Sequence, residues 1–237
     1  MVKPQALLID VFGTCVDWYS RVSQALAAAL DQDPDNPQIA NLTLAWRQAY
    51  SDGIADVREG RQPWRRVDEI HAKALTRLLP QTGFALPDQT TLTQLNLVWH
   101  RLDPWPDTVE GLRRLRQRHT VATLSNGNLD LLIDLTEHGK MQWDKLFCSD
   151  LFNRYKPDPE TYLGACRLLE LPPEQVMMVA CHRGDLHAAA SHGLSTAFIS
   201  RPAEYGGRRS ADDASAGEFD LVCSSLTELA DRLQETA

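Results

Sequence analysis

The chain has 237 residues, of which 43% are hydrophobic and 24% are charged, and its formal net charge is -8. This composition is that of a globular protein with one sizeable core, with or without a small inserted domain. Because a chain this acidic is a poor general binder of nucleic acid or anionic membranes, we expect neither as a partner.

The five cysteines are scattered, odd in number and without a C-x-x-C pair. A disulfide framework or a zinc site is therefore not expected, and a reducing cytoplasm fits the sequence better. No segment approaches the roughly 20 apolar residues of a transmembrane helix. Residues 1–10 lack the pattern of a signal peptide. We therefore expect a cytoplasmic location.

The first clear pattern is the apolar run of residues 6–12, interrupted only by Asp10. It predicts a strand covered on both faces, as in a parallel sheet. From about Tyr19 to His100 helical periodicity dominates, and no strand is expected. Helices are predicted at residues 22–30, 39–50, 66–79 and 92–101.

Beyond Pro104-Trp105-Pro106, predicted strands and helices alternate. The strands are predicted at residues 120–124, 145–148, 176–181, 196–199 and 221–223, and the helices at 109–118, 129–138, 159–169, 185–192 and 226–235. Alternation of this kind implies a parallel sheet with helices on both faces. The predicted fold is therefore α/β, with a doubly wound, Rossmann-like core at residues 1–16 and 102–237 and an all-helical cap at residues 17–101.

Polar residues gather where the predicted strands end, and in an open α/β sheet ligands bind beyond those carboxyl ends. They are Asp10 with Thr14, Ser125 with Asn126, Lys156, and His182 with Asp185. Each alone has an ordinary explanation as a helix cap, a turn residue or a solvated lysine. Their joint occurrence favours an active site.

Together these residues resemble the four motifs of the haloacid dehalogenase superfamily. The motifs are DVFGTCVD at residues 10–17, LSNG at 124–127, YKPD at 155–158 and VACHRGD at 179–185. The resemblance covers essentially the whole chain, including the helical insert after the first strand. It implies a Rossmann-like core with a cap, and Asp10 as the catalytic nucleophile.

Two positions favour a dehalogenase over a phosphatase of the same superfamily. Phosphatases carry a second aspartate two residues after the nucleophile to protonate the leaving oxygen, but here that residue is Phe12. Magnesium-dependent members usually place a second acidic residue four positions before Asp185, where this chain has Cys181. Because Mg²⁺ prefers oxygen ligands, the sequence predicts a reaction without metal or cofactor.

The cap segment Trp46-Arg47-Gln48 resembles the L-2-haloacid dehalogenases (type II), in which an arginine in this setting reaches the active site. Arg61, Arg65 and Arg66 are alternatives for that role, and a solvated Arg47 is the plainer interpretation. Tyr162, six residues after Lys156, matches a tyrosine of the same subfamily. The resemblance implies that Arg47 and Asn126 bind the departing halide.

The reaction implied is hydrolysis of short 2-haloalkanoic acids to 2-hydroxy acids. Asp10 would displace the halide and form an ester, which water then hydrolyses. We expect Lys156 to keep Asp10 ionised against desolvation, Thr14 to donate to its carboxylate, and Asp185 to act on the water.

Three further expectations concern the pocket. Ser125 and nearby backbone amides should bind the substrate carboxylate, and Phe12 and Trp46 should exclude water. His182 replaces an asparagine of the better-known type II enzymes, so its ring either helps to hold or activate water, donates to Asp10, or is only structural. Because members of the family are commonly dimers, a homodimer is an expectation that the sequence leaves open.

Two other functions remain to be separated from dehalogenation. One is a Mg²⁺-dependent phosphatase of the same fold, which Phe12 and Cys181 disfavour. The other is a non-catalytic paralogue that binds a small acid, for which the combination of Asp10, Lys156 and Asp185 would be unnecessary.

Overall fold

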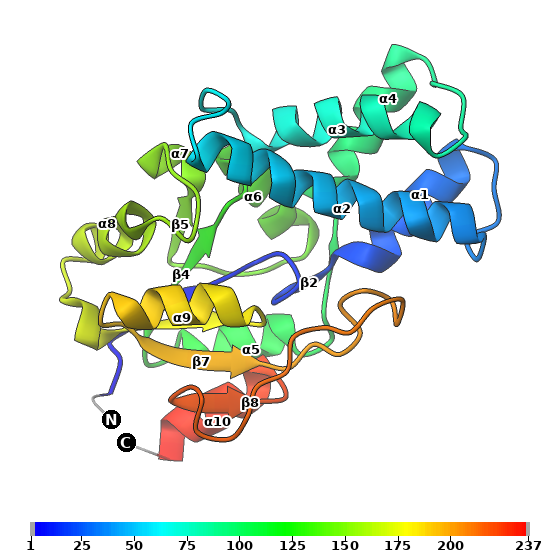
Figure 1. Cartoon of the computed structure of the whole chain (residues 1–237). Coiled ribbons are helices and arrows are strands. Elements are labelled where there is room, and N and C mark those ends of the chain that lie inside the picture. The colour runs from blue at the N-terminus through cyan, green and yellow to red at the C-terminus, as the bar shows by residue number, and fades with distance from the viewer. Residues whose placement is uncertain (1–2, 236–237) are drawn as a thin grey trace.

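The computed structural model describes residues 3–235, and a six-stranded sheet forms its core (Figure 1). The strand order is β5-β4-β1-β6-β7-β8, and every neighbouring pair is parallel. The strands are β1 (Ala6–Ile9), β4 (Thr120–Ser125), β5 (Lys145–Cys148), β6 (Val176–Ala180), β7 (Ser195–Ile199) and β8 (Leu221–Cys223). Because β1 lies between β4 and β6, the carboxyl ends of these three strands meet at the centre of one sheet edge.

Alternate side chains of β1 face opposite layers of helices. Leu7 and Ile9 pack in a hydrophobic cluster with α5 (Thr108–Leu115), α6 (Leu129–His138) and α10 (Leu226–Glu235). Leu8 packs in a second cluster with α8 (Pro159–Leu169) and α9 (Arg183–Ser191). All residues of β1 are fully buried, and burying each leucine contributes roughly 1.5–3 kcal/mol. The predicted α/β fold, with both faces of a parallel sheet covered, is confirmed.

The cap consists of helices, which gather above the core in Figure 1. They are α1 (Trp18–Ala29), α2 (Pro37–Arg58), α3 (Val67–Gln81), α4 (Gln89–Asn96) and the 3₁₀ turn η1 (Leu97–His100). The longest, α2, begins where Asn36 accepts a hydrogen bond from the backbone of Gln38 and Pro37 occupies the first turn. It continues to Arg58, eight residues past the predicted end at residue 50.

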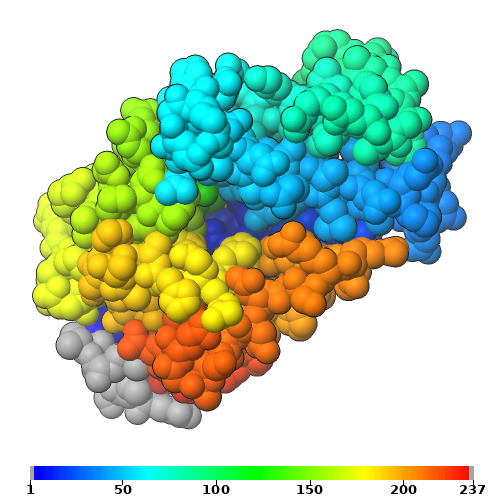
Figure 2. Space-filling model, viewed as in Figure 1, coloured from blue at the N-terminus to red at the C-terminus, as the bar shows by residue number. Residues whose placement is uncertain are grey.

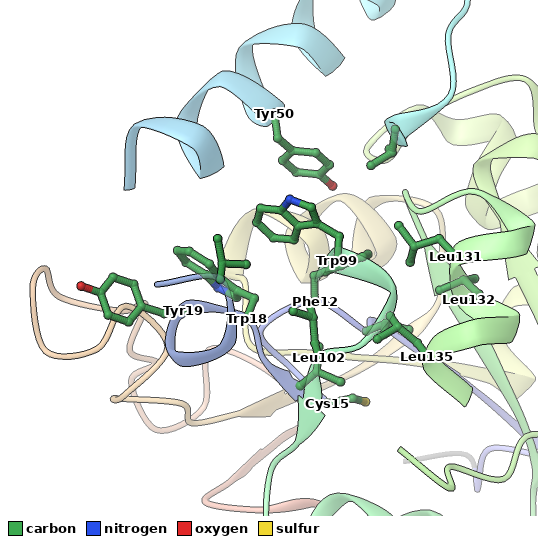
Figure 3. Packing of buried hydrophobic residues seen from close by; sticks show 14 of the residues in the cluster. Phe12, Cys15, Trp18, Tyr19, Tyr50, Trp99, Leu102, Leu131, Leu132 and Leu135 are labelled. Atoms are coloured by element: carbon green, nitrogen blue, oxygen red, sulfur yellow. The ribbon is translucent and has the colours of Figure 1, made fainter. Parts of the chain in front are cut away.

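A short antiparallel ribbon joins the cap to the core. It pairs β2 (Val16–Asp17) with β3 (Asp103–Pro104). Trp99 packs nearby, between Tyr50 of the cap and Phe12 of the core (Figure 3). Its ring centroid lies 6.2 Å from that of Phe12. One hydrophobic cluster therefore runs through both parts.

The main departures from prediction are short elements. Besides the ribbon, they are α7 (Ser149–Phe152) and the 3₁₀ turn η2 (Pro173–Gln175), which are too short to show a period. β1 also ends at Ile9 rather than at residue 12, since the chain turns away from the sheet through Gly13. Within residues 3–235, no helix combines the length and apolar character needed to cross a bilayer.

Candidate active site

Asp10 follows the last residue of β1 and stands at the floor of a cavity between core and cap. Its backbone N–H donates to the carbonyl of Val179 on β6 at 2.9 Å, which fixes the start of the loop. The cavity has a volume of about 360 Å³. Figure 2 shows a hollow between the blue cap atoms and the yellow and orange core atoms, with dark blue N-terminal atoms inside it. Asp10 itself is only 6% exposed.

One oxygen of Asp10 is held by Lys156. The ammonium donates to Asp10 Oδ1 at 2.8 Å and to Asp185 Oδ2 at 2.5 Å. The hydroxyl of Tyr162 donates to the other oxygen of Asp185 at 2.6 Å. Burial alone would raise the pKa of Asp10, but the charge of Lys156 and contacts with His182 hold that pKa well below its usual range. Asp10 is therefore an ionised, buried carboxylate.

The other oxygen of Asp10 faces Thr14 and His182. Thr14 donates to Asp10 Oδ2 at 2.9 Å, and its own oxygen accepts from the backbone N–H of Cys181 at 2.9 Å, which directs the hydroxyl proton towards Asp10. His182 Nδ1 lies 3.3 Å from the same Oδ2. Burial alone would lower the pKa of His182, but Cys181, Asp10 and Glu204 raise it well above its usual value.

Glu204 completes this side of the site, and the sequence analysis did not identify it. It is 1% exposed and lies 3.0 Å from His182 Nε2. It also accepts from the indole N–H of Trp18 at 3.2 Å. Gly13 has a φ of 85°, and a Cβ there would come within 2.5 Å of Glu204 Oε1. Glycine at this position therefore permits both the turn after β1 and the close approach of Glu204.

Hydrogen bonds to two backbone carbonyls fix the loop that follows Asp10. Arg201 donates to the carbonyl of Thr14 at 2.9 Å and makes a bidentate ion pair with Asp107, at 2.7 and 2.9 Å. Trp105, from the predicted Pro-Trp-Pro break, donates to the carbonyl of Gly13 at 2.8 Å. These contacts fix the position of the loop that carries Asp10.

Arg47 of α2 brings a positive charge from the cap into the cavity, whose wall also includes Phe12 and Asn126. Its guanidinium carbon lies 4.7 Å from the ring centroid of Tyr50 and 5.4 Å from that of Trp18. Among residues 3–235, no carboxylate lies within ion-pair distance of Arg47. The guanidinium is therefore free to meet an anion.

The alternative cap arginines lie elsewhere. Arg61 pairs with Asp56 at 2.7 Å and with Glu59. Arg66 is half exposed beside Asp130. Arg65 lines a different cavity on the cap. Arg47 is thus the one of the four candidates that lines the cavity above Asp10.

Two residues expected in the pocket do not line it. Ser125 is 2% exposed and accepts from the backbone N–H of Gly127 at 3.1 Å, so its hydroxyl serves the turn. Trp46 is fully buried in the cap and donates to the carbonyl of His71 at 2.9 Å, because it lies on the inner face of α2. Asn126 lines the cavity, although its side-chain oxygen accepts a hydrogen bond from the backbone N–H of Lys156 at 2.7 Å.

Some cavity residues were not predicted, either because they lie outside the motifs or because, like Gln48, Pro157 and Gly184, they lie in a motif that gave them no role of their own. They are Leu44, Gln48, Tyr50, Ser51, Pro157, Gly184, Tyr205 and Arg209. The carboxyl-end rule that identified Asp10 and Lys156, applied to the strand at residues 195–199, would have drawn attention to Arg201 and Glu204 in the following loop.

The sequence of the chain was compared with models of known protein families. The model for haloacid dehalogenase-like hydrolases matches residues 4–193. The chain is a haloacid dehalogenase-like hydrolase. The family identified from the four sequence motifs is thereby confirmed.

The similarity to individual relatives extends over most of this chain and most of each relative. "(S)-2-haloacid dehalogenase 1" of Pseudomonas sp. (strain CBS-3) is 34% identical over 211 residues, covering 85% of this chain and 88% of that protein. Among solved structures, the L-2-haloacid dehalogenase PA0810 is 45% identical with a TM-score of 0.90, covering 97% of this chain and 99% of that one. The defluorinating L-2-haloacid dehalogenase Rha0230 is 36% identical with a TM-score of 0.91, covering 98% and 95%.

Proposed function

We propose that this hydrolase cleaves the carbon–halogen bond of short 2-haloalkanoic acids and releases 2-hydroxy acids. The observation that carries the proposal is an ionised, buried Asp10 facing a cavity that Arg47 lines from the cap and in which Phe12 replaces a proton donor. The names of the similar proteins, which are 2-haloacid dehalogenases, support the same substrate class.

In the first half of the reaction, Asp10 attacks the carbon that bears the halogen. A carbon–oxygen bond forms, the carbon–halogen bond breaks, and the halide leaves with the bonding electrons. A halide is a weak base and needs no proton, so the phenyl ring of Phe12 is no obstacle. Arg47 and Asn126 line the cavity and supply a charge and an amide for the halide. Ser125 is buried, so backbone amides are left to bind the substrate carboxylate.

In the second half, water attacks the ester carbonyl of Asp10. Esterification removes the negative charge of Asp10, which is one of the interactions that raise the pKa of His182. The imidazole then releases its proton more readily and can accept one from the attacking water. Glu204, 3.0 Å from the far nitrogen, orients the ring and stabilises the imidazolium. Alkylation of Asp10 therefore prepares the base for the step that follows.

For Asp185 we propose a role other than acting on the water. Its two oxygens accept from Lys156 and Tyr162, which holds the carboxylate against the ammonium. We assign it to positioning Lys156. The reaction also proceeds without Mg²⁺ in this proposal, because both carboxylates already share the ammonium of Lys156 and Cys181 offers sulfur where Mg²⁺ requires oxygen.

Halide release tests the function. Purified protein is incubated with 2-chloropropionate, monohaloacetates and p-nitrophenyl phosphate, each with and without EDTA. We expect halide from the haloacids, unchanged by EDTA, and none from Asp10→Asn. Asp35→Asn, at an exposed carboxylate, is the matched control. Phosphate release that requires Mg²⁺, with no halide from any haloacid, would contradict the proposal.

Single turnover in water labelled with heavy oxygen tests the ester. Hydrolysis at the carbonyl of Asp10 places the first labelled oxygen in the protein, and the first product carries an unlabelled oxygen from Asp10. Mass spectrometry of the peptide that contains Asp10 measures the label. Label found in the first product instead would mean that water attacks the substrate directly.

A further inference from the structure

Three side chains of different chemistry, those of Cys181, His182 and Glu204, meet on the side of the imidazole that faces away from Asp10. Cys181 Sγ lies 3.6 Å from His182 Nε2 and 3.8 Å from Glu204 Oε2. His182 Nε2 lies 3.0 Å from Glu204 Oε1. A thiol, an imidazole and a carboxylate are the three ligand types that Zn²⁺ takes in proteins. Ligand atoms of a tetrahedral zinc ion, with bonds of about 2.0–2.3 Å, are about 3.3–3.5 Å apart, close to the separations here.

The contacts around these three residues orient them in the way that partners of zinc ligands do. His182 presents its other nitrogen, Nδ1, to Asp10 Oδ2 at 3.3 Å. A carboxylate on the far nitrogen of a ligating histidine fixes the tautomer and orients the ring. Glu204 is likewise oriented by the indole of Trp18 at 3.2 Å. The donors are therefore held in place before any ion arrives.

The net charge of Cys181, His182 and Glu204 also allows Zn²⁺ to replace two protons at this cluster. With a thiol, a protonated imidazole and a carboxylate, the cluster is neutral. Binding of Zn²⁺ displaces one proton from Cys181 and one from His182 Nε2, which leaves a thiolate, a neutral imidazole and a carboxylate around a double positive charge. The cluster stays neutral, so burial does not oppose the exchange. The ion can enter from the cavity, where 26% of the His182 side chain is exposed.

We propose that Cys181, His182 and Glu204 form an inhibitory binding site for Zn²⁺. Among residues 3–235, a group of potential ligands whose atoms lie within 4.8 Å of one another is Asp10, Cys181 and His182, which shares two residues with this site but does not include Glu204. The sequence spacing gave no sign of zinc because Glu204 comes from a separate loop. The binding site stands independently of the proposed function, and only its inhibitory effect rests on it.

Inhibition follows from the use of His182. A zinc ion on Nε2 leaves the ring with one proton, on Nδ1, and with no free lone pair to accept another. The metal therefore blocks the proton transfer that ester hydrolysis requires, while Asp10 remains able to form the ester. Zinc-treated enzyme should release halide once and then stop, with the ester retained on Asp10.

Binding is measured apart from activity. Metal-free protein is titrated with Zn²⁺ by calorimetry in buffers of different ionisation enthalpy, which counts the protons released, and with Co²⁺ by absorption, where a thiolate ligand gives a sulfur-to-cobalt charge-transfer band. We expect one site, about two protons released and the thiolate band. Cys181→Ser should lose the band and weaken zinc binding by at least about 100-fold, since changes around the ligands alone cost 10–100-fold.

Controls separate this site from general thiol or surface binding. Cys223→Ser, at a buried cysteine outside the cluster, should bind zinc like the unaltered protein, and Glu204→Gln should bind it more weakly. Equal zinc affinity in Cys181→Ser, or a cobalt spectrum without the thiolate band, would overturn the proposal. Protein that binds zinc in this way but releases no halide would refute the proposed function and leave the metal site standing.

Discussion

The two oxygens of Asp10 stand in different surroundings. Oδ1 meets a closed set of charges, in which Lys156 and Asp185 have side chains 7% and 9% exposed. Oδ2 meets Thr14 and His182, and the His182 side chain is 26% exposed towards the cavity, with Glu204 behind it. In the proposed reaction, the first side sets the charge of the nucleophile, and the second transfers a proton. Changes on the two sides should therefore damage different halves of the reaction.

The largest effect is expected on the Oδ1 side. Lys156→Met removes the cation that keeps Asp10 ionised, so halide release in a single turnover should fall by about 10²–10³-fold. The unpaired carboxylates should also lower the free energy of unfolding by about 3–5 kcal/mol. Rapid-quench halide measurement and urea denaturation test these effects. Lys145→Met, at an exposed lysine, is the control, and a Lys156 variant with a normal first turnover would contradict the division between the two sides.

A change on the Oδ2 side should leave the first turnover intact. His182→Gln retains a polar side chain but cannot accept the proton of water, so steady turnover should fall by about 10²-fold. Halide should still appear in a burst equal to the enzyme concentration. Intact-protein mass spectrometry should then show the ester on Asp10. Loss of the burst itself would mean that His182 serves alkylation rather than hydrolysis.

Glu204→Gln tests the same side through pH. In the resting enzyme burial opposes the charge of His182 and contact with Glu204 helps to raise its pKa. Because the neutral ring is the base in the proposed reaction, turnover should rise with pH as His182 loses its proton. Removing the negative charge lowers that pKa, so the acidic limb of the kcat profile should move to lower pH. Glu174→Gln, at the surface, should leave the profile unchanged, and an unmoved limb in Glu204→Gln would exclude electrostatic coupling to the base.

The smallest effect returns to the Oδ1 side. Tyr162→Phe removes one hydrogen bond to Asp185 and leaves Lys156 in contact with both carboxylates. The loss of about 0.5–1.5 kcal/mol corresponds to a rate reduced by about 2–10-fold. The effect should appear in the burst rate and not in ester hydrolysis. A larger effect on hydrolysis would return Asp185 to the role of base.

The same division marks what the sequence could predict. Asp10 and Lys156 lie in motifs near the ends of predicted strands, and Tyr162 lies on a periodic helix. The residues around Asp10 Oδ1, and the fold, could therefore be predicted from the sequence. Glu204 lies in the irregular loop after β7, where no period or motif marks a carboxylate that folds back onto His182. Ser125 and Trp46 were expected in the pocket because sequence cannot tell a side chain that lines a cavity from one turned into the core beside it.

Trp99 has a consequence for how the molecule comes apart. Its ring stacks on His71 of the cap at 4.2 Å and meets Phe12 of the core at 6.2 Å, between ring centroids. Because the cap and the core share one hydrophobic cluster, we expect the cap not to unfold independently of the core. Heating should therefore unfold both parts in a single transition, and the tryptophan fluorescence of the cap should change together with the circular dichroism of the sheet.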